Sequence, residues 1–398
     1  MPASLQTVTN ILKERYEGGL NKQLRQDVPT LRRIERTSEG VSHDIGGKYA
    51  VFAIHTTRNS GLGARKEGEL LPAAGQQGTE AGRVSLKHLY GAMGMTGQTF
   101  ELANSNPEAF VDAMDLERDG LKDDLAVDMN RQVWGDGSGV VATSSAAYTT
   151  VTIITTNAQY LQDKMQVDVL TSAGAARALD RQVVSVDYDT NTVVLSGAAI
   201  AAGAVGDIIV RKGNYNNEWT GLSAIVKSTG TLYNINPALV PLWKGVENAN
   251  GGTPRAISEG LMMAFYQKLR KNGGKPTAIF TSPGTWLSYW QLLVQQRQFV
   301  NTKDFTGGFS GLAFTTPDGE VPVVQDFDAK KGEMLFLDEK KIKIYREHDF
   351  KFADRDGSMW DRRTGYDAYD AWMYQYSELG TTRRNAHGVI RDLTETAI

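Results

Sequence analysis

The feature of the sequence that most constrains its fold is a polar stretch, TTRNSGLGARKEGELLPAAGQQGTEAG, at residues 56–82. Only three of its side chains are large and apolar, those of Leu62, Leu70 and Leu71. Fixing a backbone in one conformation costs roughly 1–2 kcal/mol per residue, which three leucines cannot offset over this length. We therefore expect the stretch either to remain disordered or to be held by another chain.

The segments on either side of this stretch have the composition of β-strands. They are KYAVFAIH at 48–55 and RVSLKHLY at 83–90, and antiparallel pairing would make a ribbon with the polar stretch at its tip. In the second strand, one face is expected to carry Val84, Leu86, His88 and Tyr90. An isolated two-stranded ribbon is marginally stable in water, so the ribbon also needs a neighbour.

Length, charge and composition exclude several classes of protein. The 398 residues suffice for more than one domain, and the formal charge of −3 gives no overall attraction to nucleic acid or anionic membranes. There is no cysteine, which excludes disulfides and cysteine chemistry and is compatible with a reducing cytoplasm. Charged residues within 13–17 interrupt any signal-peptide core, and the longest apolar run, 198–205, is too short to span a bilayer.

A long helix is predicted from Pro107 to Trp134. Asn106 is a good N-cap, and proline suits the first helical turn. The helix would be about 42 Å long and carries only a thin apolar stripe, so we expect it to contact a sheet or loops rather than lie inside a bundle. The stripe consists of Phe110, Met114, Leu121, Leu125, Met129 and Val133. The glycines of GDGSG, residues 135–139, end the helix.

The rest of the chain is a mixture of helices and short strands. A short amphipathic N-terminal helix is predicted to end before Gly18, and residues 148–212 are predicted to form a small, barrel-like β domain. Further helices are predicted at 255–272 and from Pro283 onward, with Ser282 as the cap of the second. The last 85 residues or so are rich in strands and aromatic side chains, beginning with a hairpin around Pro317, Asp318 and Gly319.

No catalytic, cofactor-binding or metal site is predicted. The five histidines lack the spacing of a helical metal site, and the calcium-like segment ADRDGSMWD at 353–361 fits a turn better. GDGSG follows a helix where a phosphate-binding loop would follow a strand, and the adjacent carboxylates Asp123 and Asp124 lie on a helix face that is naturally solvated. The stripe of Trp286, Tyr289 and Trp290 is more typical of a core than of a ligand platform.

The order of these parts resembles that of the major capsid proteins of tailed bacteriophages, which have the Hong Kong 97-type capsid fold. Four phrases carry the resemblance: LYGAMGMTGQTFEL, AFVDAMDLERDGLKDDLAVDMNRQVWGDGSG, AIFTSPGTWLSYWQLL and GEVPVVQDFDAKKGEMLFLD. It implies an α+β fold with a long spine helix, an extended β-hairpin loop, peripheral and axial domains and a β-rich insertion. The expected divisions are 1–45 for the N-terminal arm, 46–105 for the extended loop, 106–140 for the spine helix, 141–215 for the insertion, 216–330 for the axial domain and 331–398 for the return to the peripheral domain.

The resemblance also implies where copies of the chain touch. In the family the extended loop lies across a neighbouring subunit and the arm reaches another, so the polar stretch would be ordered by its neighbours. The contact candidates are Arg58, Leu62, Arg65, Lys66, Glu67, Glu69, Leu70 and Leu71 in the loop, with Leu5, Ile11 and Leu12 in the arm. Some relatives crosslink a loop lysine to an asparagine of a neighbour, and Lys66 is the only lysine within 56–82.

The implied function is that of a major capsid protein, which is not an enzyme and has no cofactor. Pentamers and hexamers would build an icosahedral shell that encloses double-stranded DNA, first as a precursor that then expands. Expected partners are a separate scaffolding protein, a portal and decoration proteins, with assembly in the bacterial cytoplasm and residence in the virion. An encapsulin-type compartment shell is the nearest alternative; a β-rich carbohydrate-active enzyme and a tail or decoration protein are more distant ones.

Overall fold

The computed structural model of the protein describes residues 27–39, 41, 49–99, 107–297, 312–354 and 358–397. At 107–116 and 295–297 it describes the backbone alone. The predicted N-terminal helix with Leu5, Ile11 and Leu12, the Asn106 cap and the middle of the 353–361 turn lie outside the described residues. None of the described helices is both long and apolar enough to cross a membrane.

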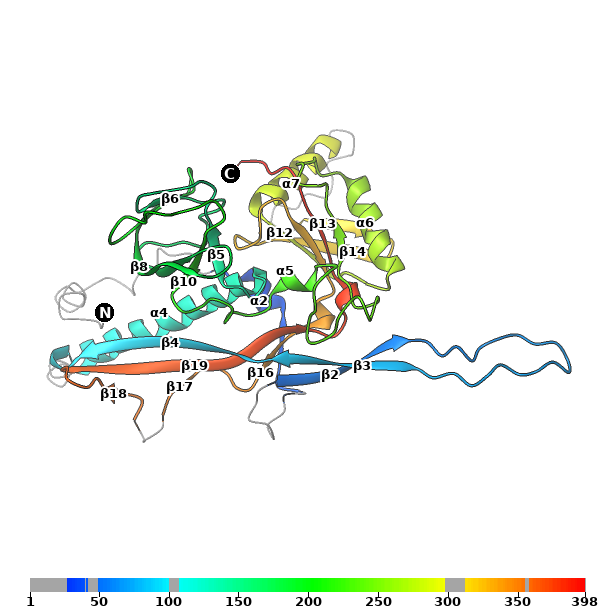
Figure 1. Cartoon of the computed structure of the whole chain (residues 1–398), viewed down its shortest axis with the longest axis horizontal. Coiled ribbons are helices and arrows are strands. Elements are labelled where there is room, and N and C mark those ends of the chain that lie inside the picture. Colours follow the sequence, from blue (N-terminus) through cyan, green and yellow to red (C-terminus); the bar gives the residue numbers. More distant parts are fainter. Residues whose placement is uncertain are drawn as a thin grey trace.

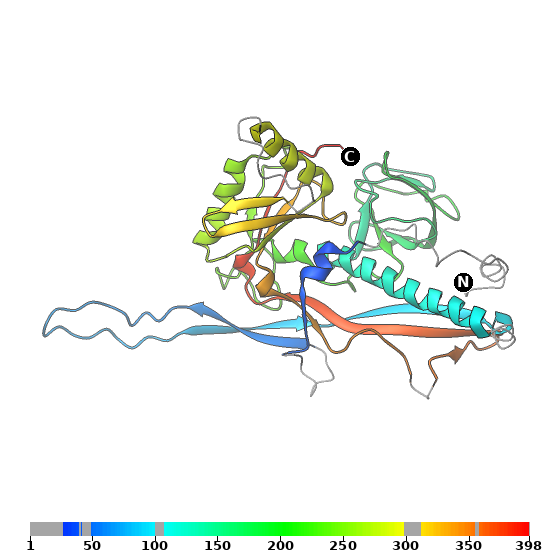
Figure 2. The same ribbon diagram turned by 180° about the vertical axis from the view of Figure 1, so that it is seen from behind.

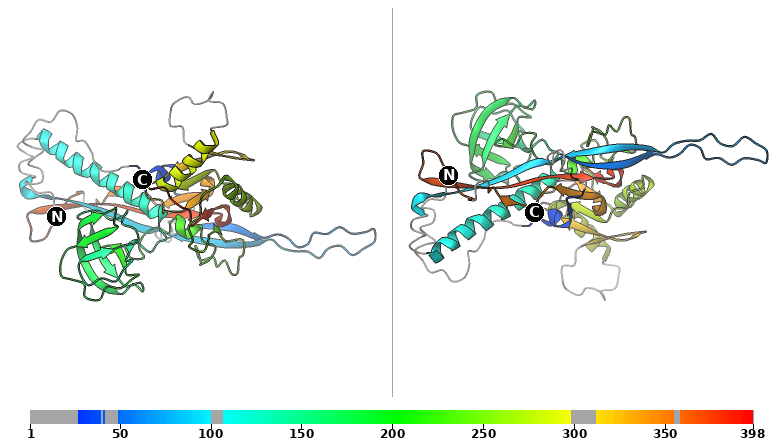
Figure 3. Two further views of the ribbon diagram at one scale, coloured as in Figure 1. Left: turned by 90° about the horizontal axis from the view of Figure 1, so that it is seen from above. Right: turned by 90° about the horizontal axis from the view of Figure 1, so that it is seen from below.

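The molecule is built around an elongated sheet with a long helix along one face (Figures 1 and 2). A small barrel and a larger α/β domain lie on the same side of the sheet as the helix. A two-stranded ribbon projects from one end and continues the line of the sheet, as the views from above and below show (Figure 3). The predicted division into six segments stays a prediction.

The elongated sheet has β19 (Ala368–Thr381) at its centre. One edge of β19 pairs with β4 (Lys87–Thr96), in the register Tyr374 to Tyr90. The other strands are β16 (Ile342–Arg346), β17 (Lys351–Phe352), β18 (Asp361–Arg362) and β1 (Glu35–Thr37), the last paired with β16. Side chains of β4 alternate between buried and exposed, so one face packs against the helix and the other faces outward.

The two ribbon segments pair as predicted, but the bounds predicted for the second strand are wrong. β2 (Tyr49–Thr57) pairs antiparallel with β3 (Gly78–Ser85), which begins before residue 83. The chain changes partner at Leu86 and then continues as β4. The alternation of buried and exposed side chains therefore shifts by one residue between β3 and β4. Val84 and Leu86 are buried, whereas His88 and Tyr90 are exposed and do not share a face with them.

The long helix α4 spans Pro107–Trp134, as predicted, and packs on β4. Gly91 of β4 permits the close approach, because a Cβ there would stand 2.9 Å from methyl carbons of Leu121 and Leu125. The described end of the apolar stripe is buried at Leu125, Met129 and Val133. The helix ends at GDGSG, in which Gly137 and Gly139 have positive φ angles.

The small β domain is a six-stranded, closed sheet that begins at residue 140 rather than 148. A bridge between Ser144 and Thr155 joins its first and last strands, which gives the predicted barrel-like form. Its core is mainly aliphatic and includes Val141, Ile153, Val167 and Ile209. In spatial order the strands are β5 (Val140–Thr143), β10 (Ile208–Arg211), β7 (Gln166–Leu170), β8 (Ala176–Asp187), β9 (Thr192–Leu195) and β6 (Thr152–Ile154).

The α/β domain contains a mixed six-stranded sheet and two main helices. The helices are α6 (Glu259–Lys271) and α7 (Pro283–Arg297). The strands in spatial order are β11 (Val246–Asn248), β20 (Gly388–Ile390), β15 (Met334–Leu337), β12 (Ala278–Thr281), β14 (Gly319–Gln325) and β13 (Ala313–Thr316). The hairpin of β13 and β14 confirms the turn predicted at Pro317 and Asp318.

Two predictions for this domain need correction. Helix α6 begins four residues later than expected, because Arg255 instead forms a bridge with Leu393 and Ser258 caps the helix. The aromatic stripe of α7 is only partly core. Tyr289 is buried, but Trp290 is 41% exposed because it faces away from the sheet-side cluster.

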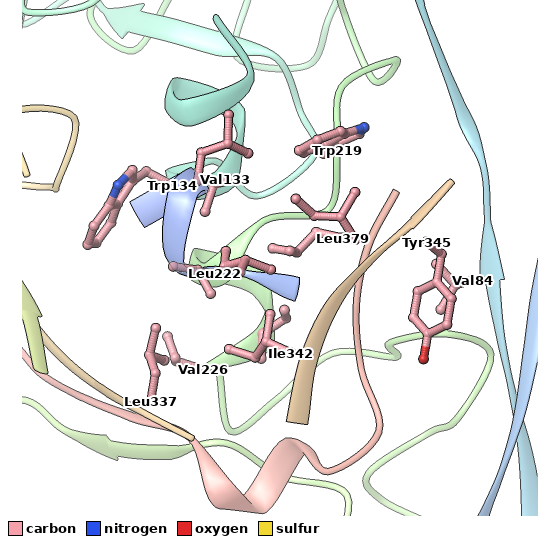
Figure 4. Close-up of a cluster of buried hydrophobic side chains, with 14 of the residues drawn as sticks. Val84, Val133, Trp134, Trp219, Leu222, Val226, Leu337, Ile342, Tyr345 and Leu379 are labelled. Atoms are coloured by element: carbon pink, nitrogen blue, oxygen red, sulfur yellow. The ribbon is translucent and has the colours of Figure 1, made fainter. Parts of the chain in front are cut away.

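A central core joins the parts of the molecule where α4 ends (Figure 4). The short helix α5 (Leu222–Ile225) lies against Val133 and Trp134, and β15, β16 and β19 contribute Leu337, Ile342 and Leu379. The buried guanidinium of Arg384, in the turn after β19, donates to the carbonyls of residues 224, 225, 229 and 230 around α5.

Glu378 makes the stability of this core depend on pH. Its carboxylate is buried and accepts the N–H of Thr220 (2.7 Å) and of Leu379 (3.1 Å). Burial raises the pKa of Glu378 to about 8, although these bonds and Lys87 oppose the rise. Because the folded pKa exceeds the unfolded value, its contribution is fully present below about pH 4.5 and is lost as the pH rises through about 8.

We expect the free energy of unfolding of the isolated wild-type subunit to fall by about 1–3 kcal/mol more than that of Glu378→Gln between pH 5 and 8.5. Urea titrations of both proteins at each pH measure the difference. Parallel pH profiles would contradict the assignment.

Candidate intersubunit contact surfaces

The root of the ribbon is anchored to the body by aromatic packing. Phe52 of β2 lies with its ring centre 6.1 Å from that of Tyr233 and 6.0 Å from that of Trp243. The N–H of Arg83 donates to the carbonyl of Tyr233 at 3.0 Å. The root is therefore fixed by the chain itself.

The tip of the ribbon, residues 58–77, has only local polar contacts. Asn59 links the two arms by accepting the N–H of Gly61 and donating to the carbonyl of Gly75. The arms nearly touch there, since a Cβ on Gly61 would lie 2.9 Å from the nitrogen of Gly75. Further out, Arg65 donates to the carbonyl of Leu70, and the N–H of Lys66 donates to the carboxylate of Glu69.

The apolar side chains of the tip are not covered by the described part of the chain. Leu62, Leu70 and Leu71 are 83%, 90% and 77% exposed. Within the part of the chain that the structure describes, no ion pair is formed by Arg58, Arg65, Lys66, Glu67 or Glu69. All eight loop candidates are thus gathered on a free surface, while the arm candidates lie outside the described residues. Their contact role stays a prediction.

A buried polar hub fixes the angle between α4 and the α/β domain. Asp326, at the end of β14, accepts the hydroxyl of Thr30, the side-chain amide of Asn130 and the indole N–H of Trp134. Thr30 belongs to the short helix α2 (Pro29–Arg33), and the other two donors belong to α4. Three segments distant in sequence therefore converge on one carboxylate.

A buried ion-pair cluster joins α4 to the segment that follows the barrel. Arg131 makes two bonds to Glu218, of 2.9 and 2.6 Å, and one of 3.0 Å to Asp128. Burial alone would raise the pKa of Asp128, but Arg131, Arg211 and Gln132 outweigh it and the net shift is downward. Sequence reasoning missed this cluster and the Asp326 hub, because their members are distant in the chain and resemble ordinary surface polar residues.

The described residues contain no group of three or more histidine or carboxylate side chains placed to hold a metal ion. The perturbed groups Glu378, Asp128 and Arg131 are each engaged in the internal bonds described above.

Comparisons with known proteins place the chain in a family. A family model described as "SU10 major capsid protein" matches residues 124–394. No curated protein matches the chain.

Solved capsid structures share the fold over nearly the whole chain. The capsid asymmetric unit of cyanophage A-1(L) aligns with a TM-score of 0.60 at 14% identity, covering 98% of this chain and 99% of that one. The capsid of Myoviridae phage XM1 aligns with a TM-score of 0.50 at 8% identity, covering 97% and 98%. These matches confirm the predicted Hong Kong 97-type fold. Because the family model covers more than half of the chain, the chain belongs to the SU10 major capsid protein family.

Proposed function

We propose that this protein is the major structural subunit of a phage head and that many copies assemble side by side into a closed shell. The observation that carries the proposal is the family match over residues 124–394, which includes the last part of α4, the barrel and the α/β domain from β11 to β20. The exposed ribbon tip agrees with it, because three uncovered leucines on a long projection suit a chain that completes itself on a neighbour. The role is structural, with residence in the virion capsid.

Several finer points belong to the same proposal. Copies would form pentamers and hexamers, and the shell would enclose double-stranded DNA without sequence-specific contacts, as the net charge of −3 suggests. A portal, a scaffolding protein and decoration proteins are proposed as partners. A crosslink from Lys66 is a proposal of the same kind, and a single band near the monomer mass on a denaturing gel of shells would reject it.

Electron microscopy of the purified, concentrated protein tests the function. We expect closed shells or rings of capsomers. A monomer that stays monomeric under assembly conditions would contradict the proposal. Shells that package a cargo protein instead of DNA would favour the encapsulin alternative.

The ribbon-tip leucines give a mutational test. We expect the double variant Leu70→Ser, Leu71→Ser to leave the unfolding of the isolated subunit unchanged within about 0.5 kcal/mol, because both side chains are exposed. Assembled shells should dissociate at lower urea concentration, since burial of a leucine contributes about 1.5–3 kcal/mol and each copy would lose two. Val205→Ser, at an exposed valine of the barrel, is the matched control. Shells as resistant as the wild type would show that the leucines are not buried on assembly.

A further inference from the structure

A positively charged surface lies at the root of the ribbon. Two cavities, of about 450 and 290 Å³, flank the loop 236–243 and share Leu242 and Asn385 in their walls. Leu239 and Leu242 of this loop are 81% and 58% exposed. The cations that line the two cavities, here called the basic corner, are Arg58, Lys244, Lys268, Lys341 and Arg383.

The described residues do not neutralise the charges of the basic corner. Lys268 donates to the main-chain carbonyl of Glu247, and Arg383 donates to the side chain of Asn385. In the described part of the chain, no carboxylate forms an ion pair with any of the five cations.

Two carboxylates lie close by, and both are already engaged. Glu247 lines the smaller cavity, but it accepts two bonds from Ser228 and pairs with Arg391. Lys341 and Arg383 act to lower the pKa of Asp338, but this carboxyl is buried, and burial raises its pKa. The surface therefore suits a partner that presents carboxylates beside apolar side chains.

The barrel presents such a surface at the opposite end of the body. The turn after β8 exposes Tyr188 and Asp189, and Val184 of β8 is also exposed. Asp163 lies close enough to Tyr188 to raise the pKa of its phenol, behind the effect of burial. Asp163 and Asp189 are exposed and, among the residues that the structure describes, their side chains make no hydrogen bond; Lys164 follows Asp163 in the sequence. We call Asp163, Val184, Tyr188 and Asp189 the acidic barrel patch.

The positions of the two surfaces favour contact between copies. The barrel stands over α4, away from the ribbon, whereas the basic corner lies where the ribbon leaves the body (Figure 1). One chain cannot bring them together without unfolding. A second copy placed further along the ribbon would turn its barrel end toward the basic corner of the first. Contacts between two different patches of identical subunits close into rings when the rotation permits.

We propose that the basic corner of one subunit binds the acidic barrel patch of an adjacent subunit. The proposal rests on the proposed function, because a shell is what places the copies side by side. It assigns the barrel a role in joining subunits. It also gives the loop 236–243 a partner for its exposed leucines.

Charge reversal and charge exchange test this pairing. Variant one is Lys341→Glu with Arg383→Glu, variant two is Asp163→Lys with Asp189→Lys, and variant three combines all four changes. We expect the first two to assemble at least about tenfold more slowly, because like charges would face each other, and the third to recover most of the loss. Light scattering at low salt measures assembly, and Lys331→Glu, an exposed lysine outside both surfaces, is the control.

Each outcome bears on the proposal. The pairing would be overturned if variants one and two assembled as fast as the wild type. It would also be overturned if variants one and two were both impaired and variant three showed no recovery. Either result would stand even though the wild type forms shells. Circular dichroism of the isolated variants should match the wild type, since all four side chains are exposed or half-exposed. If one variant does misfold, Arg383→Gln and Asp189→Asn provide milder changes, which should weaken assembly in the same direction and make it less sensitive to salt. A wild type that never assembles would instead refute the proposed function.

Discussion

Replacement of Asp326 by alanine is expected to lower the free energy of unfolding of the subunit by about 3 kcal/mol or more. The carboxylate is fully buried and accepts the hydroxyl of Thr30 at 2.5 Å, the indole N–H of Trp134 at 3.2 Å and the amide of Asn130 at 3.1 Å. The N–H of Asp328 donates to it as well, at 2.8 Å. The alanine variant removes this acceptor from the Thr30 hydroxyl, the Trp134 indole and the N–H of Asp328, whereas the amide of Asn130 keeps its bond to Asp328 at 2.6 Å. Each buried donor left without an acceptor costs about 1–3 kcal/mol.

A matched control comes from another aspartate of the same domain. Asp318 bonds Arg270 and Tyr266 but is partly exposed, so Asp318→Ala should cost much less. Equilibrium urea unfolding, followed by two spectroscopic probes because the chain has several domains, compares the two variants. Equal losses for Asp326→Ala and Asp318→Ala would show that the hub does not hold α2, α4 and the α/β domain together.

Replacement of Arg131 by methionine is expected to cost about 3–5 kcal/mol, because two buried carboxylates lose their shared cation. Glu218 loses both of its bonds to the guanidinium, whereas Asp128 keeps Gln132 and the more distant Arg211. The triple variant Arg131→Met, Glu218→Gln, Asp128→Asn should recover much of the loss, since it leaves no buried charge without a partner. Recovery would assign the loss to stranded charge; its absence would indicate a packing defect.

The same cluster predicts acid sensitivity. The pKa of Asp128 is lower in the folded protein than its unfolded value of 3.8. Its contribution to stability is therefore present above that value and is lost as the pH falls through the folded pKa. Urea titrations of the wild type below pH 4 should show a steeper loss than those of the triple variant.

Local signals in the sequence predicted both ends of α4 and the turn between β13 and β14. Proline at residue 107 and the glycines after Trp134 set both ends of α4 without help from the rest of the chain. The partner change at Leu86 was not predictable in this way, because β4 is defined by its long-range pairing with β19. A prediction from the two-residue alternation of strand side chains carried the pattern of β3 on into β4. It therefore placed His88 and Tyr90 on the wrong face.

The candidate contact surfaces differ in the same way. The exposure of the ribbon tip was predictable because its composition cannot support a core of its own, whichever way the chain folds. The basic corner was not, because its cations come from five separate segments that meet only in the folded chain. Arg131 and Glu218 likewise lie 87 residues apart, and neither carries a local sign of burial.

Hydrogen exchange of the amides in residues 58–77 most directly tests whether the ribbon depends on neighbours. Few of these amides have a hydrogen bond within the described chain, so in the isolated subunit we expect nearly unprotected exchange. In assembled shells the same amides should exchange at least about tenfold more slowly, while those of β12 and β15 in the core change little. Strong protection of the tip in the isolated subunit, or equal exchange in the two states, would contradict a ribbon completed by adjacent copies.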